Sequence, residues 1–523
     1  MSKNLNLLSF FLIELLQSLI RPLKLAGLKG SDTNATHLFH QTLSCTYELN
    51  PHLQMTELFK KTATEVVELL KAGEITPAEL LEVAISRIEA VDGQINALPI
   101  RCFDRAQEQA KQMVRPIDDS FRGHLYGLPI AVKDYNDVGG VLTTYGSPIY
   151  AENVPDKSDT TIAHLEKNGA IPIAKSNVPE WAGGHTFNPI FGTTLNPWNL
   201  KLSVGGSSGG SAAALASGMV WLATGNDLGG SLRTPAAFNG VVGLRPGPGL
   251  VARGKRLQPF DSLWVEGPMG RCVADVALML DAQVGHERED PFSFPTSKIP
   301  YLDALNDSGR VKKVAFSNDL GVVHVSKEIS SITEKSALRL QEIGIEVTDE
   351  LPDFSGVLDS FQTLRAILLG TIMGPLLEKH REEIAPEIVG NVEKGFAVTP
   401  EAIFEAERTR WKLYHSMMEF FETYDYLICP TTSIPPFPVE QRYVTEIDGI
   451  PCETYIDWFA ITFAVTMTSC PVISIPCGFT KNMLPVGLQI IGRPRNEWEL
   501  LRDTSRMEDL FGISNQLPID PRT

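Results

Sequence analysis

The sequence lacks a surplus of basic residues, and its few cysteines form no metal-binding pattern. Among 523 residues, 46 are Lys or Arg and 63 are Asp or Glu, giving a formal net charge of −17 and an isoelectric point near 5.1. Such a chain has no basic footprint for general nucleic-acid binding, so we expect no nucleic-acid partner. The seven cysteines are scattered, without a Cys-x-x-Cys pair or a histidine at zinc spacing. We therefore expect no metal site, free thiols and a cytoplasmic location.

The N-terminal part also lacks a hydrophobic run long enough to span a membrane. Residues 1–54 contain an apolar stretch, but Glu14 interrupts it, and its uncharged run is far shorter than the ~20 residues of a membrane span. Its length suits a signal-peptide core, yet no clear small-x-small cleavage site follows. We interpret residues 1–54 as an N-terminal extension, either a non-native start or a targeting segment. Targeting stays open, and we expect no stable membrane insertion.

An orderly helical pattern begins after Met55. Residues 62–65 and 76–79 have the Thr-x-x-Glu spacing of capping boxes, and the second is followed by an apolar stripe that predicts a helix up to Gly93. Short apolar runs that are typical of buried strands then alternate with helical stretches. The predicted strands are 125–133, 170–175 and 219–225, and the predicted helices between them are 160–170 and 211–218. This alternation predicts an α/β fold with a largely buried sheet.

Residues 285–425 are more charged and mostly helical in pattern, and strand-like runs return after them, at 424–435, 470–479 and 484–492. No Gly/Ser-rich or Pro-rich linker separates the helical region, and no internal repeat is present. We therefore predict one large domain with a helical cover at about 285–425.

Three segments could carry chemistry, and the first ends a predicted strand. The strand GLPIAVK closes on Lys133. Alone, such a residue is usually a strand-end lysine that extends its amine to solvent. If Lys133 is buried instead, desolvation lowers its pKa and leaves a neutral amine that can act as a base. The adjacent Asp134 need not pair with it, because successive strand side chains face opposite ways.

The second segment is the Gly-rich stretch SVGGSSGGSAAALASG at 203–218. It runs straight into an Ala-rich helix, unlike a linker, and contains no G-x-x-x-x-G-K-[ST] phosphate loop. It satisfies G-x-S-x-G around both Ser207 and Ser208, the pattern of a nucleophile elbow in Ser–His–Asp α/β-hydrolases. That interpretation needs a later Asp and His. The later histidines, His286, His324, His380 and His415, have no recognisable catalytic context, so the α/β-hydrolase stays an open alternative.

The third segment, NDLGGSLRTPAAFNG at 226–240, places two glycines directly before Ser231. Two residues without side chains suit a flexible linker. They also suit an oxyanion hole, in which backbone N–H groups must face a ligand without obstruction.

Taken together, these segments resemble the amidase signature family of serine hydrolases. The resemblance runs from about Met55 to about Arg495, and its Ser-rich signature is highly specific. The blocks that carry it are GLPIAVKD, NVPEW, NPIFGTTLNPWN, GGSSGGSAAALASG, GNDLGGSLRTPAAFNGVVGLRP, EGPMGRCVADVALML and PVGLQIIGRP. The resemblance implies an amidase signature fold over residues 55–515, in which a large mixed central sheet is covered by helices on both faces.

The resemblance also implies a Ser–Ser–Lys triad. By position, Ser231 would be the nucleophile, Ser207 the bridging serine and Lys133 the base. The family's oxyanion donors fall on the backbone N–H groups of Leu228, Gly229, Gly230 and Ser231, and no metal, nucleotide or organic cofactor is needed. The departures are small: Asn226 and Leu228 replace threonines that many members carry, and Val204 replaces a common proline.

The resemblance predicts an amidase that hydrolyses a carboxylic acid amide to the carboxylate and ammonia or an amine through an acyl-serine. Its partner would be a small-molecule amide substrate, and a homodimer is an open expectation. Trp181 and residues 450–466 are candidate walls of the acyl pocket. The main alternative is the A subunit of a tRNA-dependent glutamyl/aspartyl amidotransferase, but its usual Ser-Leu-Asp-Gln-like segment is replaced here at 259–271. A catalytically dead binding module is disfavoured, because all three triad positions are intact.

Overall fold

The computed structural model describes residues 57–113, 123–254, 257–296, 299–309 and 311–523. The chain divides into two units, Met1–Glu57 and Leu58–Thr523, and the second is described below. The predicted extension at residues 1–54 lies outside the described residues.

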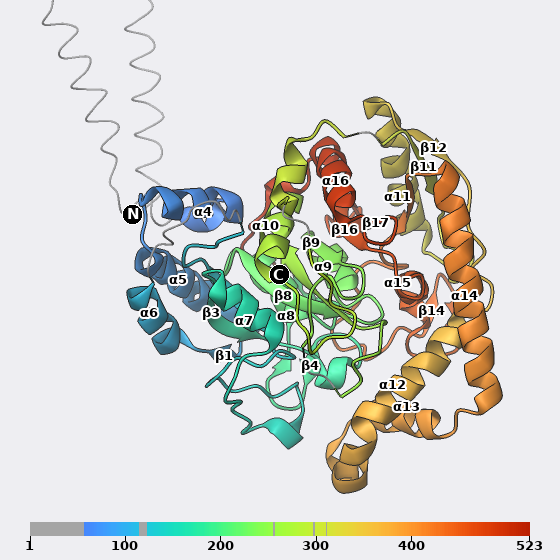
Figure 1. Cartoon of the computed structure of the whole chain (residues 1–523), viewed down its shortest axis with the longest axis horizontal. Helices are drawn as coiled ribbons and strands as arrows, with labels where there is room; N and C mark the ends of the chain where they lie inside the picture. The colour runs from blue at the N-terminus through green and yellow to red at the C-terminus, as the bar shows by residue number, and fades with distance from the viewer. Residues whose placement is uncertain (1–56, 114–122, 255–256, 297–298, 310) are drawn as a thin grey trace, which may run out of the picture. The chain divides into compact units, whose positions relative to one another are not determined.

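An 11-stranded mixed sheet runs through the second unit (Figure 1). It is parallel around β2 and β8 and again around β13 and β11, and antiparallel between these two regions. In spatial order the strands are β1 (Ile100–Arg101), β3 (Ile171–Ser176), β2 (Pro129–Lys133), β8 (Leu222–Asp227), β10 (Val265–Gly270), β9 (Val242–Arg245), β16 (Val472–Phe479), β17 (Pro485–Ile491), β13 (Tyr426–Pro430), β11 (Lys313–Phe316) and β12 (Glu346–Thr348). Three two-stranded ribbons lie outside it: β4 (Phe187–Asn188) with β5 (Gly192–Thr193), β6 (Leu195–Asn196) with β7 (Asn199–Ser203), and β14 (Glu446–Ile447) with β15 (Ile450–Pro451).

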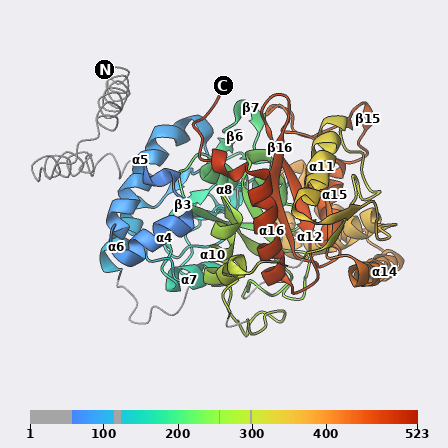
Figure 2. The ribbon, with the colours of Figure 1, turned by 90° about the horizontal axis from the view of Figure 1, so that it is seen from above.

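Helices cover both faces of the sheet, as predicted. Figure 2 shows α4, α5 and α6 at one end of the unit and α11, α12 and α14 at the other. The helices are α4 (Ala63–Ala72), α5 (Pro77–Ile95), α6 (Phe103–Gln112), α7 (Thr160–Lys167), α8 (Gly209–Ala216), α9 (Arg233–Asn239), α10 (Val273–Gln283), α11 (Lys327–Arg339), α12 (Val357–His380), α13 (Pro386–Phe396), α14 (Pro400–Thr423), α15 (Ala460–Thr466) and α16 (Glu497–Phe511).

Strand β9 shows how the two helical layers are separated. Its side chains Val242 and Leu244 belong to the same buried cluster as residues of α10. The intervening Gly243 faces α9, where a Cβ would come within 3.1 Å of the Ala236 Cβ. Because successive strand residues point to opposite faces, α9 and α10 cover opposite sides of the sheet.

The first helices begin where the sequence predicts. Thr62 and Thr76 each accept a hydrogen bond from the backbone of the Glu three residues later, and each Glu side chain accepts one from the cap backbone. Both capping boxes are therefore confirmed. Helix α5 does not stop at Gly93 but continues to Ile95, because the left-handed residue that ends it is Asn96, with a φ of 60°.

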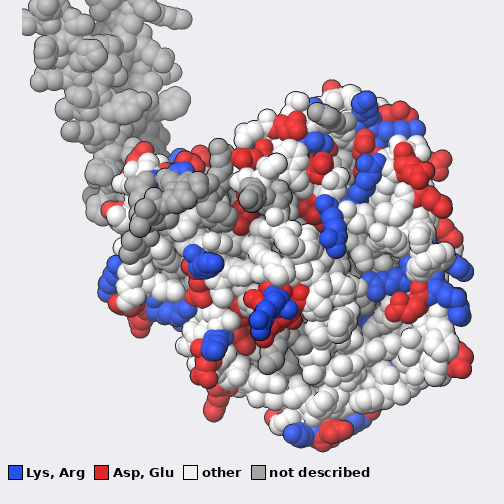
Figure 3. Space-filling model, in the orientation of Figure 1, with Lys and Arg blue, Asp and Glu red and all other residues white. Residues whose placement is uncertain are grey.

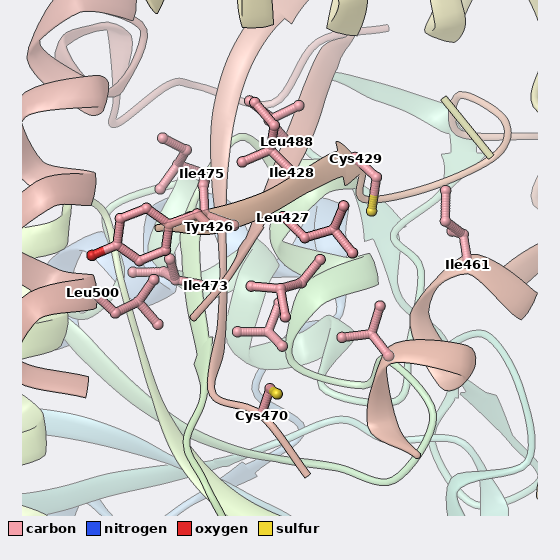
Figure 4. Close-up of a cluster of buried hydrophobic side chains, with 14 of the residues drawn as sticks. Tyr426, Leu427, Ile428, Cys429, Ile461, Cys470, Ile473, Ile475, Leu488 and Leu500 are labelled. Atoms are coloured by element: carbon pink, nitrogen blue, oxygen red, sulfur yellow. The ribbon is translucent and has the colours of Figure 1, made fainter. Parts of the chain in front are cut away.

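The C-terminal half of the sheet supplies a large part of the hydrophobic core (Figure 4). Leu427, Ile473 and Leu488 come from the neighbouring strands β13, β16 and β17, and all three are fully buried. Helices α15 and α16 add Ile461 and Leu500. Burial of one such side chain contributes ~1.5–3 kcal/mol, so this cluster is a major source of the stability of the sheet.

The region 285–425 is mostly helical, as predicted, but it is not only a cover. It contributes the strands β11 and β12, which extend the central sheet in parallel from β13. These strands were not predicted because they are four and three residues long, too short for a clear alternation.

Helix α12, with the 3-10 turn that follows it, is long and apolar enough to cross a membrane by length and composition alone. In the described structure it packs against α13, α14 and α15. Core helices of soluble proteins also meet these criteria of length and composition. Several apolar residues of α12 line the pocket described below.

The face drawn in Figure 3 carries acidic and basic side chains mixed with each other, separated by wide uncharged areas. No large field of one sign is visible on this face.

Candidate active site

Three segments far apart in the sequence meet at one edge of the sheet. Strands β2 and β8 pair in parallel, with Ile130 opposite Leu222, so their carboxyl ends lie side by side. Lys133 closes β2, and its backbone N–H donates to the Thr224 hydroxyl at 2.8 Å. The Gly-rich loop before α8 brings Ser207 to the same place, and the turn after β8 brings Ser231. This edge, outside the carboxyl ends of parallel strands, is where α/β proteins commonly place their sites.

Lys133 is fully buried at the centre of this arrangement. Its Nζ lies 2.7 Å from the Ser207 Oγ and 2.6 Å from the Asn226 Oδ1. Burial lowers the pKa of Lys133 to about 7, although the nearby carboxylates of Glu266 and Asp227 act in the opposite direction. A large fraction of this lysine is therefore a neutral amine near pH 7, which can accept a proton.

Asp134 does not pair with Lys133, in agreement with the alternation of strand side chains. It lies on the other face, where its carboxylate is 2.7 Å from the Nζ of Lys175. The carboxylate of Asp134, the nearest one in the sequence, therefore does not stabilise the charged form of Lys133, which helps to keep its amine neutral.

Asn226 is a family departure that contacts the lysine directly. Its Oδ1 accepts from Lys133, while its Nδ2 is buried and has no hydrogen-bond partner among the described residues. Asn226 also lines the pocket described below. A neutral amine donates through its protons and accepts through its lone pair, so donation to Asn226 leaves the lone pair available to Ser207.

Ser207 and Ser208 differ in their environments. Ser207 follows a cis peptide bond and contacts Lys133, whereas the Ser208 Oγ is buried and without a partner in the described part of the chain. The Ser208 N–H donates to the Ser231 carbonyl at 3.2 Å. Across the described ranges, no hydrogen bond joins a histidine to either serine or to Ser231. No hydrogen bond joins the hydroxyls of Ser207 and Ser231 there either, and such contacts often tighten only when substrate binds.

Asp227 fixes the turn that carries Ser231. Its buried carboxylate accepts from the Gly230 N–H at 2.8 Å and forms ion pairs with Arg233 and Arg245. Burial opposes ionisation, but the two arginines outweigh it and hold the pKa of Asp227 well below its usual range. Asp227 thus stays charged, and the turn is anchored on both sides.

The two glycines before Ser231 differ in what a side chain at each position would meet. Gly230 has a φ of +123°, and a Cβ there would lie 2.3 Å from the Thr462 Oγ1, so no other residue fits. A Cβ at Gly229 would meet only ordinary contacts, and it would project among Phe361 and Phe459 of the pocket wall. Gly230 therefore needs glycine for its backbone, whereas a side chain at Gly229 would occupy space in the pocket.

The predicted oxyanion donors are only partly available. The Gly230 N–H donates to the Asp227 carboxylate in this structure, and its role as an oxyanion donor stays a prediction. The N–H groups of Leu228, Gly229 and Ser231 make no hydrogen bond with the described residues. Leu228, Gly229 and Ser231 are half-exposed and line the pocket.

Ser231 opens into a mainly apolar pocket. The chamber beside it is narrow, about 80 Å³, and adjoins a wider one of about 330 Å³ with which it shares wall residues. Trp181 and Trp264 belong to both walls. As expected for the acyl pocket, Trp181 and residues of the segment 450–466 take part. The segment contributes Tyr455, Ile456, Trp458 and Phe459.

The part of the pocket wall that α12 provides was not predicted from the sequence. Phe361, Arg365, Leu368, Leu369 and Ile372 of this helix line the pocket. The signal for them was the apolar character of α12 on more than one face, which in a surface helix indicates a second buried contact.

The fold and the site together define an α/β enzyme in which a buried lysine contacts a serine beside an apolar pocket. The family model described as Amidase matches residues 79–501, and the chain belongs to the amidase signature family. The family resemblance stated from the sequence is therefore confirmed.

Relatives with different functions match the chain. The chain is 32% identical over 467 residues to an acylamidase of Rhodococcus erythropolis, covering 88% of this chain and 97% of that protein. It is also 32% identical over 472 residues to the A subunit of the glutamyl-tRNA(Gln) amidotransferase of Thermodesulfovibrio yellowstonii, covering 85% and 96%. A bacterial aryl acylamidase crystal structure superposes with a TM-score of 0.80 at 27% identity, covering 88% of this chain and 99% of that one. These similarities indicate an amide-acting hydrolase, with its substrate unspecified.

Proposed function

We propose that this protein is an amidase that hydrolyses a carboxylic acid amide to the carboxylate and ammonia or an amine through an acyl-Ser231 intermediate. One observation carries the proposal: the Lys133 Nζ lies 2.7 Å from the Ser207 Oγ in a buried site. The pKa of Lys133, lowered to about 7 by burial, supports its role as the base.

The chemistry begins with proton transfer. As the Ser231 Oγ attacks the amide carbonyl carbon, its proton passes to Ser207, and the Ser207 proton passes to neutral Lys133. The resulting tetrahedral intermediate carries a negative oxygen. Collapse of the intermediate breaks the C–N bond, and the proton returns through Ser207 to the leaving nitrogen, which cannot leave as an anion. The acyl group is then an ester of Ser231.

Water completes the cycle. It attacks the Ser231 ester while its proton passes along the same relay, and collapse releases the carboxylic acid and restores the Ser231 hydroxyl. The N–H groups of Leu228, Gly229 and Ser231 are the candidate donors to the negative oxygen. Loss of one donor of this kind costs about 10²–10³ in rate.

The apolar and aromatic pocket supports a substrate with an apolar acyl or aryl portion. The A subunit of an amidotransferase remains the second candidate, because one such protein is as similar in sequence as the acylamidase. The departure at residues 259–271 favours the stand-alone amidase. The six cysteines among the described residues are free thiols, which supports the proposed cytoplasmic location.

The proposal is tested on purified protein with a panel of acetamide, long-chain and aryl amides. Ser231→Ala should lower turnover by a factor on the order of 10⁵–10⁶ and remove covalent labelling by a fluorophosphonate probe. Ser208→Ala is the matched control and should keep both. Labelling that persists in Ser231→Ala and disappears in Ser208→Ala would support the nucleophile elbow instead. An inactive chain that copurifies with stoichiometric partner proteins would support the amidotransferase.

A further inference from the structure

Among the described residues that line the chamber beside Ser231, Arg365 is the only charged one. Arg365 projects from α12 and lines the same chamber as Ser231. Its Nη1 donates to the Asn391 Oδ1 at 3.2 Å and its Nη2 to the Tyr455 hydroxyl at 2.6 Å. Both partners are uncharged. Within the described ranges, no Asp or Glu lies within ion-pair distance of Arg365.

Arg365 differs in this respect from other arginines of the same region. Arg381 pairs with Glu393, and Arg442 pairs with Glu387 at 2.7 Å. Arg365 is half-exposed, and its printed hydrogen bonds go only to neutral partners, so a ligand with a negative charge would meet a guanidinium that no described carboxylate pairs with.

The Tyr455 hydroxyl provides a second donor beside the arginine. It accepts from Arg365 and also from the Asn391 Nδ2, each at 2.6 Å. A phenol oxygen has two acceptor positions and one proton, so with both acceptor positions used its own proton is left to donate. Tyr455 lines the chamber as well. The pocket thus offers a guanidinium and a hydroxyl donor held by one asparagine.

A carboxylate matches this pair of donors. The planar guanidinium presents paired N–H groups at the spacing of carboxylate oxygens, and hydrogen bonds to a charged acceptor are about twice as strong as neutral ones. Arg365 is fixed by Asn391 and Tyr455 before any ligand arrives, which lowers the entropy lost on binding.

We propose that Arg365 and Tyr455 bind a carboxylate carried by the amide substrate, at a distance from the amide that Ser231 attacks. This inference rests on the proposed amidase function and specifies its substrate class. The carboxylate could belong to the acyl portion, as in a dicarboxylic acid monoamide, or to the amine portion, as in an N-acyl amino acid. In either substrate class, Arg365 and Tyr455 would donate hydrogen bonds to the carboxylate.

The experiment compares kcat/KM for a homologous series of dicarboxylic acid monoamides, N-acyl amino acids and neutral amides of matched length. The wild-type enzyme should prefer one carboxylate series by about 10- to 100-fold, the range expected for hydrogen bonds to a charged group. Arg365→Met should remove this preference through KM and should affect the neutral amides much less than the carboxylate series. Tyr455→Phe should reduce it by a smaller factor. The matched control, Arg408→Met, removes a guanidinium of α14 that pairs at the surface with Glu405, and should change neither series.

Two outcomes would overturn the inference. One is a wild-type enzyme that treats carboxylate and neutral amides alike, and the other is an Arg365→Met variant that loses both equally, as a purely structural arginine would. Binding to Ser231→Ala, measured by calorimetry, separates this from the proposed function. Arg365-dependent binding of a carboxylate amide that the active chain never hydrolyses would reject the amidase and retain the carboxylate site.

Discussion

At the scale of single residues, the burial of Lys133 creates both its reactivity and its pH dependence. The same desolvation that makes a charged lysine costly here leaves a neutral amine beside Ser207. The opposing carboxylates of Asp227 and Glu266 prevent the pKa from falling further. We therefore expect the proposed base to be partly neutral close to pH 7, because these two influences oppose each other.

We predict that kcat/KM rises with pH through the pKa of Lys133, about 7, and remains high in mildly alkaline buffer. The sign follows from the base: its active form is deprotonated, so activity is present above the pKa and is lost as the pH falls through it. Lys133→Met should lower kcat by about 10²–10⁴-fold and abolish this limb of the profile. A pH–rate profile of the purified enzyme checks both. A histidine variant that removed the limb, with Lys133→Met near normal, would contradict the assignment.

We also predict that Asn226→Asp moves the acid limb to higher pH. The substitution places a carboxylate at the position 2.6 Å from the lysine Nζ, and a negative neighbour favours the charged amine, so the pKa of Lys133 rises. Activity at pH 7 should fall while the alkaline plateau is less affected. Asn318→Asp is the matched control, because it adds the same charge where the asparagine contacts only Ser330 of α11. An unchanged limb in Asn226→Asp would show that Asn226 does not contact Lys133.

At the scale of elements, the turn between β8 and α9 shows why the sequence there is so constrained. Asp227 anchors the turn through Arg233 and the Gly230 N–H, and the left-handed backbone of Gly230 directs Ser231 to the pocket. The helix that follows, α9, is fully buried, so the turn cannot shift without moving the core.

Gly230→Ala should destabilise the protein by about 2–5 kcal/mol, since it adds the ~1–2 kcal/mol cost of a left-handed alanine to the ~1–3 kcal/mol cost of overpacking against Thr462. Activity should fall as well. Gly449→Ala is the matched control: this glycine also has a positive φ, 83°, but a Cβ there meets nothing within 4 Å. Gly449→Ala should therefore lower the stability only by the ~1–2 kcal/mol cost of a left-handed alanine. Urea unfolding of the wild type and of both variants measures these free energies. Equal losses of stability in the two variants would contradict the clash at Thr462.

At the scale of the whole molecule, the site is assembled from the two halves of the chain. Lys133, Ser207 and Ser231 come from the N-terminal half, whereas α12 and the segment 450–466 of the C-terminal half contribute part of the pocket wall. Direct contacts join the halves, since Arg233 donates to the carbonyl of Thr462 and the side chain of Gln489. The reacting groups and the substrate wall are therefore held in one unit.

Removal of residues 1–54 should leave kcat/KM and the melting temperature nearly unchanged. The candidate site lies wholly within Leu58–Thr523, and α4 is capped by its own Thr62 and Glu65. Activity and thermal unfolding of the truncated protein check this. Insoluble or inactive protein would contradict the interpretation of 1–54 as dispensable.

A longer truncation, through residue 73, is the control and should be strongly destabilising. The Trp221 indole donates to the Leu58 carbonyl at 3.3 Å, and Arg271 donates to the carbonyls of Phe59 and Lys61. Deletion would leave these buried donors unpaired and expose the surface of α10 against which α4 packs.

The sequence by itself determined the features that depend on near neighbours. The capping boxes and the strand runs of β2, β3, β8, β13, β16 and β17 could be recognised from local patterns, and resemblance to a known family singled out Lys133, Ser207 and Ser231. Each rests on a propensity or a motif that is complete within a few residues.

Only the tertiary structure decided the features that depend on distant neighbours. The short strands β9 and β10 carry glycines and a proline and became strands because β8 and β16 flank them. The burial of Lys133 and the position of Arg365 beside Tyr455 were equally invisible in the sequence. Burial and pairing are set by which elements lie side by side, and that order places residues hundreds of positions apart in contact.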